Sequence, residues 1–437
     1  MKLNIKNFAK IKEADIAVDG ITVIAGENNT GKSTVGKVLF SLFNALADID
    51  SKIREERLKE IESTNRGIML NYASTIDMSR SAVNRVVYSV ARKIGARLRE
   101  QLNSNFEVPE DSISEIIREV MMNCEMATRS SDKHDWEEML DEVNKNTREV
   151  LNLPEEIIIM EFISRYFKSV FHSQIQILSV GEDKEAIVTL EIKDKKERLT
   201  FEKNYCKNFE GEINIIHKAI YIDNPFIVDE LSEYNDLTPM NQMLKDLLFN
   251  SYKERPLDGV IESVRAKEKL SNVFETLRNV VDGEIIIDQN DEFYLKNDNY
   301  NEPISFRNLS TGIKSFVILK MLLEKGCLKN KDVVILDEPE IHLHPQWQIA
   351  YAELIVLLQK QFDLSVIVTT HSPYFVDAIN LFSCKYDTDK KVNYYLSSSN
   401  GNAVSMEDVT DRIDMIYQKM ASPIQMLDTL RYELNNN

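Results

Sequence analysis

The chain has 437 residues, of which 43% are hydrophobic and 28% charged, a composition typical of a soluble globular protein with two or three lobes. Its formal net charge of -18 argues against a surface that binds nucleic acid non-specifically over its whole extent, because phosphate contacts need concentrated lysine and arginine. No long apolar run or signal-peptide core is present, and the four cysteines form no close pair, so we expect a cytoplasmic protein without a disulfide framework or a zinc site.

The first elements in chain order are a strand, a loop and a helix. The run ITVIAG reads as a buried strand, and KSTVGKVLFSLFNAL has apolar residues at helical spacing. The loop between them spells G-x-x-x-x-G-K-S, whose backbone N–H groups and helix N-terminus surround an anionic polyphosphate. The glycines allow the tight backbone, the lysine reaches the β- and γ-phosphates, and the serine hydroxyl ligates Mg²⁺. The candidate binding residues are Gly26, Asn28, Asn29, Thr30, Gly31, Lys32, Ser33 and Thr34.

Residues 1–46 therefore form the first part of a nucleotide-binding α/β lobe, and residues 47–172 a mostly helical insertion, since their amphipathic runs contain little Gly or Pro. Heptads are not sustained, which favours short bundles over a long coiled coil. One window of the insertion is basic and has no acid. It is either a solvated helix face or a local nucleic-acid site. Its cations are Arg80, Arg85, Arg92, Lys93, Arg97 and Arg99.

Strand-like runs return at residues 173–225 and indicate that the sheet of the first lobe resumes there. A second helical segment follows at residues 226–282. Residues 283–390 contain the remaining motifs, and residues 391–437 read as a small hairpin followed by terminal helices.

Two distal motifs surround a helix of strong apolar periodicity. Leu309, Ser310, Thr311 and Gly312 precede the helix, where Ser310 is able to cap the orphan N–H groups. The strand that follows ends in Asp337 and Glu338, at the end where doubly wound sheets place ligand chemistry. Because strand side chains alternate, the two carboxylates point to different sides. We assign Asp337 to the metal and Glu338 to polarising the attacking water as general base.

A third apolar strand ends at His371 in the run LSVIVTTHSPYF. A histidine at a strand tip contacts the γ-phosphate or the charge that develops during hydrolysis, although a single histidine at such a place is also commonly structural. Its position behind the other three motifs favours the catalytic interpretation.

The ordered set Gly26–Ser33, Leu309–Gly312, Ile335–Glu338 and His371 resembles the ABC-type ATPase heads of SMC and DNA-repair proteins and of the OLD family. The strings DEPEIHLHP and TTHSP resemble most closely the OLD-like ATPases of bacterial anti-phage systems, including Gabija, Septu and PARIS. The resemblance implies the fold class, which is an α/β P-loop NTPase of the ABC/SMC type with split ATPase lobes and a large helical insertion.

The resemblance also implies ATP and Mg²⁺ as cofactors and a head-to-head homodimer or larger assembly. In that dimer ATP lies between the phosphate loop of one copy and Ser310 and Gly312 of the other. His344 falls where transporters carry an aspartate, which leaves its role open, and Asn224 is only a positional guess for the Q-loop glutamine. Because few residues follow the helix after His371, we expect no fused nuclease but a separate nuclease or toxin effector.

Three other functions compete with an ATP-hydrolysing defence switch. An SMC-like DNA-repair or chromosome-associated ATPase should have a long heptad arm and a broad basic groove, and neither is clear. The nucleotide-binding subunit of a transporter needs its first two motifs closer together than Ser33 and Leu309. A scaffold that binds ATP without turnover is disfavoured because Asp337, Glu338 and His371 are all present.

Overall fold

The computed structural model describes residues 1–72, 76–104, 109–129, 133–176, 184–211, 214–232, 237–253, 271–400 and 403–436. Its contacts divide the chain into two compact units. The first unit is formed by Met1–Ala47 together with Met160–Asn437, and the second by Asp48–Ile159.

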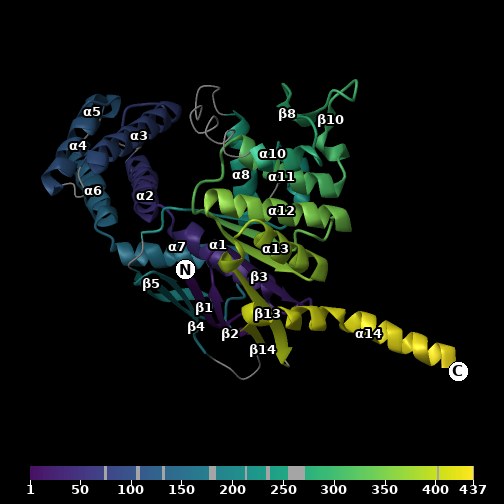
Figure 1. The fold of residues 1–437 in the computed structure, drawn as a ribbon. Coiled ribbons are helices and arrows are strands. Elements are labelled where there is room, and N and C mark those ends of the chain that lie inside the picture. Colours follow the sequence, from purple (N-terminus) through teal and green to yellow (C-terminus); the bar gives the residue numbers. More distant parts are fainter. Residues whose placement is uncertain are drawn as a thin grey trace. The chain divides into compact units, whose positions relative to one another are not determined.

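The first unit is built on one large mixed sheet, whose strands can be followed in Figure 1. The strand order is β6-β5-β4-β1-β2-β14-β13-β3-β12-β11-β7, and a smaller sheet has the order β10-β9-β8. The bounds of the strands are β1 (Lys2–Phe8), β2 (Ile11–Ala17), β3 (Ile21–Gly26), β4 (Ala186–Ile192), β5 (Lys195–Glu202), β6 (Tyr205–Gly211), β7 (Ala219–Ile222), β8 (Glu284–Ile287), β9 (Phe293–Lys296), β10 (Ile304–Ser305), β11 (Val333–Asp337), β12 (Ser365–Thr370), β13 (Val392–Asn400) and β14 (Ala403–Asp408).

One half of this sheet is parallel and aligns the carboxyl ends of its strands. Neighbours from β13 through β3, β12 and β11 to β7 all pair in parallel. In register, Ala25 of β3 lies opposite Thr370 of β12, and Asp337 of β11 lies opposite Thr369. All residues of β3, β7 and β12 are buried, as expected for parallel strands covered on both faces. The sequence motifs that follow these strands therefore meet at one edge.

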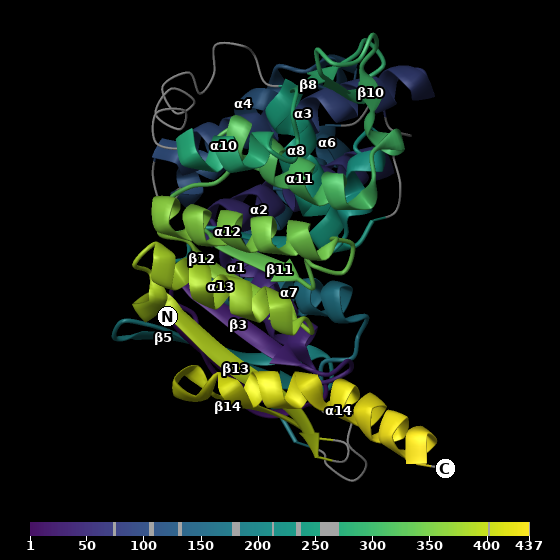
Figure 2. The same cartoon turned by 45° about the vertical axis from the view of Figure 1, so that its right-hand side comes forward.

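Helices cover both faces of the parallel half. The face that carries Val23, Leu336 and Val368 joins a core with α11, α12 and α13, which Figure 2 shows as a layer over the sheet. On the other face α1 packs so closely that a Cβ on Gly36 would lie 2.7 Å from Cγ2 of Ile335. The helices of this unit are α1 (Lys32–Leu46), α7 (Glu155–Phe171, which begins in the second unit), α8 (Pro239–Lys253), α10 (Ser271–Arg278), α11 (Thr311–Glu324), α12 (Pro345–Phe362), α13 (Pro373–Lys385) and α14 (Asp414–Asn436).

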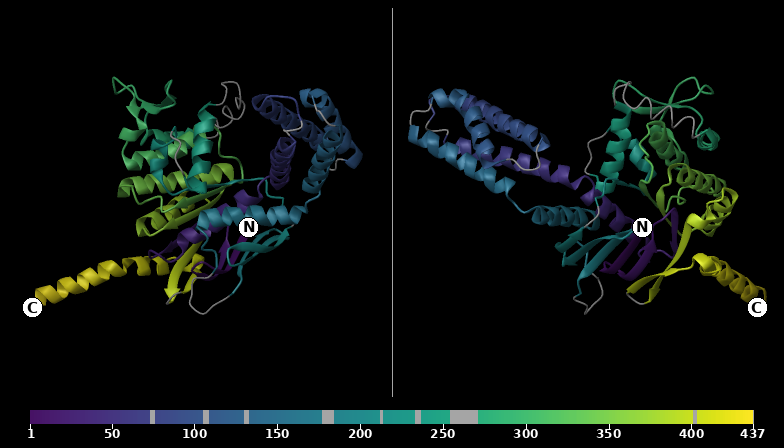
Figure 3. Two further views of the ribbon diagram at one scale, coloured as in Figure 1. Left: turned by 180° about the vertical axis from the view of Figure 1, so that it is seen from behind. Right: turned by 60° about the vertical axis from the view of Figure 1, so that its left-hand side comes forward.

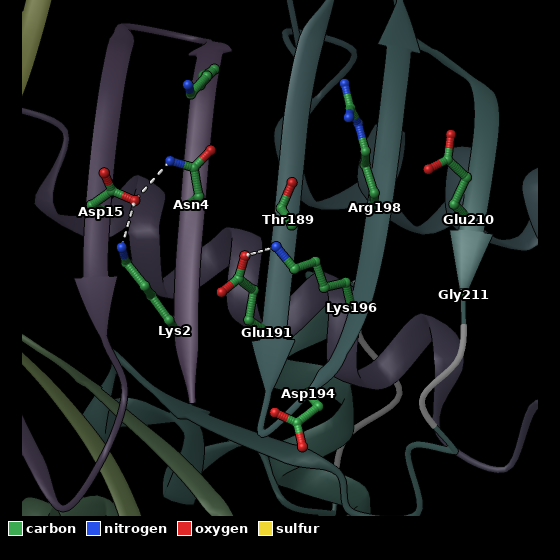
Figure 4. Close-up of a pocket in the computed structure, with 11 residues that line it drawn as sticks. Lys2, Asn4, Asp15, Thr189, Glu191, Asp194, Lys196, Arg198, Glu210 and Gly211 are labelled. Atoms are coloured by element: carbon green, nitrogen blue, oxygen red, sulfur yellow. Dashed lines mark hydrogen bonds and ion pairs between the residues drawn. The ribbon is translucent and has the colours of Figure 1, made fainter.

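The antiparallel half has one apolar face and one charged face. Phe8 of β1 and Phe201 of β5 pack against Phe167 and Phe171 of α7. These ring contacts explain why the chain from Met160 belongs to the first unit, although the sequence pattern assigned residues 47–172 to the insertion. On the other face, charged side chains line a shallow hollow of about 790 Å³ (Figure 4). Ion pairs such as Lys196–Glu191 partly neutralise it.

The C-terminal residues 391–437, predicted as a small hairpin and helices, contribute two strands to the main sheet. Strands β13 and β14 do pair antiparallel, but β13 also pairs in parallel with β3 inside the main sheet. The single helix α14 follows where the sequence suggested several.

The second unit is a helical bundle with its own apolar core, drawn in blue in Figure 3. A buried polar pair links two of its helices, because Asn65 donates to Thr147 at 3.0 Å and neither side chain reaches solvent. In the described ranges no helix is long and apolar enough to cross a membrane. The helices are α2 (Ile49–Asn71), α3 (Arg80–Ser104), α4 (Glu110–Met122), α5 (Glu125–Arg129) and α6 (Lys133–Leu151).

Two glycine substitutions should change stability in opposite directions. Gly36→Ala places its methyl group against Ile335 and the Tyr221 ring, and overpacking of this kind costs about 1–3 kcal/mol. Gly67→Ala on α2 meets nothing within 4 Å and should add about 0.5–1 kcal/mol, because alanine favours the helix. Denaturant unfolding followed by circular dichroism measures both, and equal stability of the two variants would contradict the packing of α1 on the sheet.

Candidate functional site

The phosphate loop joins β3 to α1 through two glycines that other residues replace poorly. Gly26 has φ 156° and lies so near β13 that a Cβ would be 2.6 Å from the carbonyl oxygen of Ser397. Gly31 has φ 74° and stands directly before α1. The Thr30 hydroxyl donates to the Glu27 carbonyl at 2.7 Å and closes the turn from inside. The path of the loop thus depends on these two glycines and on the hydrogen bond from the Thr30 side chain.

Lys32 lies at the centre of this loop. Its ammonium donates to the carbonyl oxygens of Gly26 at 3.1 Å and Glu27 at 2.9 Å, and lies 3.4 Å from Oε1 of Glu338. The side chain is only 3% exposed. A buried lysine in a glycine-containing loop at the start of a helix is an arrangement that suits a polyphosphate.

Asp337, at the end of β11, is surrounded by hydroxyl donors. Its Oδ1 accepts from Ser33 at 3.0 Å and from Thr369, while Oδ2 accepts from Tyr221 at 2.6 Å. Burial, and then the charge of Asp337, raises the pKa of the Tyr221 hydroxyl well above its ordinary value, so Tyr221 remains a donor.

The same residues fit Mg²⁺. The Ser33 hydroxyl and the Asp337 carboxylate are oxygen ligands within reach of one ion, beside a lysine that would hold phosphates. Mg²⁺ takes one or two protein oxygens and fills its other positions with water and phosphate oxygens. It therefore does not need a cluster of three or more His, Cys, Asp or Glu ligands, and the described residues contain none.

Glu338 and His371 face each other across the edge of the sheet. Glu338 lies just beyond β11 with φ 50°, so the turn of the backbone, and not simple strand alternation, separates it from Asp337. Its backbone N–H donates to the Thr369 carbonyl at 3.1 Å. Nδ1 of His371 is 3.8 Å from Oε2 of Glu338. The structure thus brings Glu338 and His371 together with Lys32, which lies about three hundred residues earlier in the sequence.

Glu340 is a residue of the site that the sequence motifs did not identify. It is 2% exposed, and its Oε1 accepts from the Thr370 hydroxyl and from the His371 N–H at 3.0 Å. Burial raises the pKa of its carboxyl group, against the opposing effect of these hydrogen bonds. The only sequence signal was an extra acid in the string DEPE.

A cavity of about 350 Å³ opens beside the loop, and its far wall also went unrecognised in the sequence. The wall comes from the β1–β2 turn at Lys10 and from His172 and Gln174, which follow α7. Lys10 donates to Oδ1 of Asn29 at 2.5 Å, and the Ala9 N–H donates to the Ile175 carbonyl at 2.9 Å, so the two segments form one wall.

The predicted loop residues do not all line this cavity. Asn28 is exposed and is absent from the lining. The residues of the predicted set that do line it are Asn29, Thr30, Gly31, Lys32, Ser33, Thr34 and Glu338.

Ser310 and Gly312 begin α11 but differ in environment. Ser310 occupies the N-cap position and is exposed, yet its side chain makes no capping hydrogen bond, so the alternative that Ser310 serves only as a helix cap is not supported. Gly312 is buried, and a Cβ there would lie 2.8 Å from the Trp347 ring. Within one copy, Gly312 allows close packing of α11 against α12.

The end of β7 contributes a further acid. Burial, followed by the charge of Asp337, raises the pKa of Asp223. The side-chain oxygen of the neighbouring Asn224 accepts from the Phe226 N–H at 3.0 Å and caps the short 3₁₀ helix η2 (Pro225–Asp229). His344 stands exposed before α12 and makes no capping bond with its side chain.

The basic window lies on α3 of the second unit, and its cations are exposed. Two of them have acidic neighbours, because Arg99 is 2.7 Å from Glu55 and Arg97 is 3.6 Å from Glu119. Binding of nucleic acid by these cations stays a prediction.

Comparison with solved structures finds SMC heads, at low similarity. The SMC head domain from Thermotoga maritima is 10% identical, with a TM-score of 0.38, and the match covers 93% of this chain and 98% of that one. An SMC head with an extended coiled coil, bound to the C-terminal domain of ScpA and derived from Pyrococcus furiosus, is 11% identical, with a TM-score of 0.41 and 98% coverage of both chains. At these scores the likeness carries no conclusion about function.

Two sequence comparisons are more informative. The Septu protein PtuA of Bacillus thuringiensis is 36% identical over 91 residues, which is 18% of this chain. The match spans 22% of the length of that relative. The family model described as AAA ATPase domain matches residues 1–376, a span that includes the phosphate loop, Asp337, Glu338 and His371. The chain therefore belongs to the AAA ATPase domain family.

Proposed function

We propose that this protein is an ATP-hydrolysing switch in which two copies close head to head on ATP. The observation that carries the proposal is the meeting of Lys32, Asp337, Glu338 and His371 at the carboxyl ends of adjacent strands β3, β11 and β12. A cation for phosphate, a metal ligand and a base beside a histidine are the parts that phosphoryl transfer to water requires.

Each of these side chains has a distinct role in the proposed reaction. Lys32 holds the β- and γ-phosphates, and Glu338 accepts the proton of the attacking water. Bound Mg²⁺, held by Ser33 and Asp337, would neutralise charge on the phosphates. His371, with 43% of its side chain exposed, faces the space beyond Glu338 and donates to the γ-phosphate as charge develops there.

The surroundings of the site support closure on a second copy. Ser310 is exposed at the start of a helix, where an N-terminus favours an anion. Phe226, Ile341 and Tyr374, which flank the motifs at Asn224, Glu338 and His371, leave 42%, 52% and 68% of their area exposed. A partner head would bury this apolar surface and place its Ser310 against the nucleotide.

We place this switch in an anti-phage system, where it controls a separate nuclease or toxin. Support comes from the partial match to the Septu protein PtuA and from the strings DEPEIHLHP and TTHSP. In this proposal closing of the heads on ATP and reopening after hydrolysis change how the effector is held.

Lys32→Ala should weaken ATP binding by about 10- to 150-fold, because one charged hydrogen-bond partner is worth about 1.5–3 kcal/mol. Titration with a fluorescent ATP analogue in the presence of Mg²⁺ measures the affinity. Lys12→Ala, which removes an exposed lysine from β2, is the matched control. Unchanged affinity in Lys32→Ala would mean that the loop is not the nucleotide site.

Glu338→Gln should separate binding from chemistry. The amide keeps the size of the side chain but removes the base, so turnover should fall by about 10²- to 10⁴-fold while ATP still binds. Since hydrolysis no longer reopens the heads, the closed dimer should accumulate with ATP. Phosphate release and light-scattering mass test the two parts. Near-normal turnover would show that Glu338 is not the base. A molar mass that is the same with and without ATP would contradict closure of the two heads.

A mixture of Lys32→Ala and Ser310→Arg copies tests whether each site is shared. Each variant should be inactive alone, but in a mixed dimer one site combines an intact loop with an intact Ser310. Turnover should therefore recover after subunit exchange. A mixed dimer has one intact site of two, so its turnover should approach half of the wild-type value. Mixed dimers shown by mass spectrometry without any recovery would mean that each copy hydrolyses ATP by itself.

A further inference from the structure

The proposed mechanism leaves one buried acid without a role. Glu340 is 2% exposed and lies behind the strand tip that carries His371. Its Oε1 accepts from the Thr370 hydroxyl and from the backbone N–H of His371. In the part of the chain that the structure describes, its Oε2 is buried and has no hydrogen-bond partner. A buried carboxylate oxygen without a donor costs stability, so its retention suggests a function.

The imidazole of His371 lies close to the other oxygen of the same carboxylate. Nδ1 of this ring lies 3.6 Å from Oε1 of Glu340, just beyond hydrogen-bond distance. The His371 side chain is 43% exposed, whereas the Glu340 side chain is 2% exposed. A small rotation of the ring would bring its Nδ1–H onto the carboxylate and leave Nε2 directed away from Glu340.

A second carboxylate competes for the same proton. Nδ1 is also 3.8 Å from Oε2 of Glu338, whose Oε1 is 3.4 Å from the Lys32 ammonium. When phosphates attract Lys32, Glu338 loses part of this partnership and becomes a better acceptor for the imidazole. A base that accepts from His371 is less free to accept from water.

We propose that Glu340 is the positioning residue of His371, holding its backbone N–H and taking its Nδ1–H so that Nε2 faces the γ-phosphate and Glu338 stays free for water. The proposal rests on the function proposed above. Glu340 does not line the cavity beside the phosphate loop, and in this proposal it acts only through His371. A carboxylate that fixes the tautomer and orientation of a histidine is an established device in other sites.

The backbone around His371 is braced from the same segment. Gln348 of α12 accepts from the Ser372 hydroxyl at 2.9 Å and donates to the Leu343 carbonyl at 3.1 Å. The Leu343 N–H in turn donates to the Glu340 carbonyl at 2.9 Å. The turn from Glu340 to Gln348 thus holds both His371 and Ser372, and of its residues Glu340 is the one whose side chain lies 3.6 Å from the imidazole.

A double-mutant cycle tests the proposal. Glu340→Met removes every acceptor and should lower the turnover number about 10- to 100-fold with little change in ATP affinity. Glu340→Gln keeps an acceptor for the Thr370 hydroxyl and the His371 N–H but loses the charge that attracts Nδ1–H, so its loss should be intermediate. In a His371→Ala background both changes at position 340 should alter turnover less than about twofold, because the group through which Glu340 acts is gone.

Controls separate this role from a merely structural one. Glu353→Met removes a partly buried acid of α12 that bonds Lys385 and Tyr386, and should leave turnover unchanged. If Glu340→Met is unfolded, the double-mutant cycle with His371→Ala is measured with Glu340→Gln instead. Equal losses with and without His371, or a loss of ATP affinity matching the loss of turnover, would overturn the proposal.

A second readout is independent of hydrolysis. Hydrogen exchange at the His371 amide, measured without nucleotide, should be at least tenfold faster in Glu340→Met than in wild type or Glu353→Met. If wild type binds ATP without turnover, the proposed hydrolysis fails, and this exchange still decides whether Glu340 holds His371. Unchanged exchange would overturn the positioning role even if the protein is an active ATPase.

Discussion

The site depends on the carboxylate of Asp337, which three different parts of the chain hold in place. Ser33 reaches it from the phosphate loop, Tyr221 from β7 and Thr369 from β12. Donors that replace part of the lost solvent stabilise a partly buried carboxylate, so these hydroxyls orient Asp337 and tie together the segments that carry them. The parallel register of β7, β11, β12 and β3 is what brings the donors to one point.

The sequence predicted those parts of the site that local patterns determine. The glycines before and within the loop, Lys32 and Ser33 follow from the needs of one turn, and the acids after β11 follow from their place at a strand end. Glu340 and Tyr221 could not be assigned in this way, because their role comes from pairing between strands that lie far apart in the sequence. Ser310 shows the limit of local rules, since a good N-cap residue stands at the right position without capping.

For the fold, too, the sequence predicted the elements that local patterns determine, but not how distant segments pack. The alternation of apolar strands and amphipathic helices indicates the α/β class and the helical insertion. The placement of β13 beside β3, and of the second half of α7 against Phe8 and Phe201, depends on packing between distant segments. Amphipathic periodicity marks which face of α7 is buried but not which unit buries it, so the pattern could not fix the boundary at Met160.

The charges around the loop support the proposed response to nucleotide. Glu338 lies beside the buried Lys32, Glu340 lies beside His371, and burial together with the charge of Asp337 raises the pKa of Asp223. A polyphosphate that entered alone would add negative charge to this group and also attract Lys32 away from Glu338. In the proposed function, a divalent cation would therefore enter with the phosphates, at the Asp337 carboxylate that three hydroxyl donors already orient. In the proposed function, phosphates that attract Lys32 would release Glu338 from it, and Glu340, by taking the Nδ1–H of His371, would keep the Glu338 carboxylate free for water.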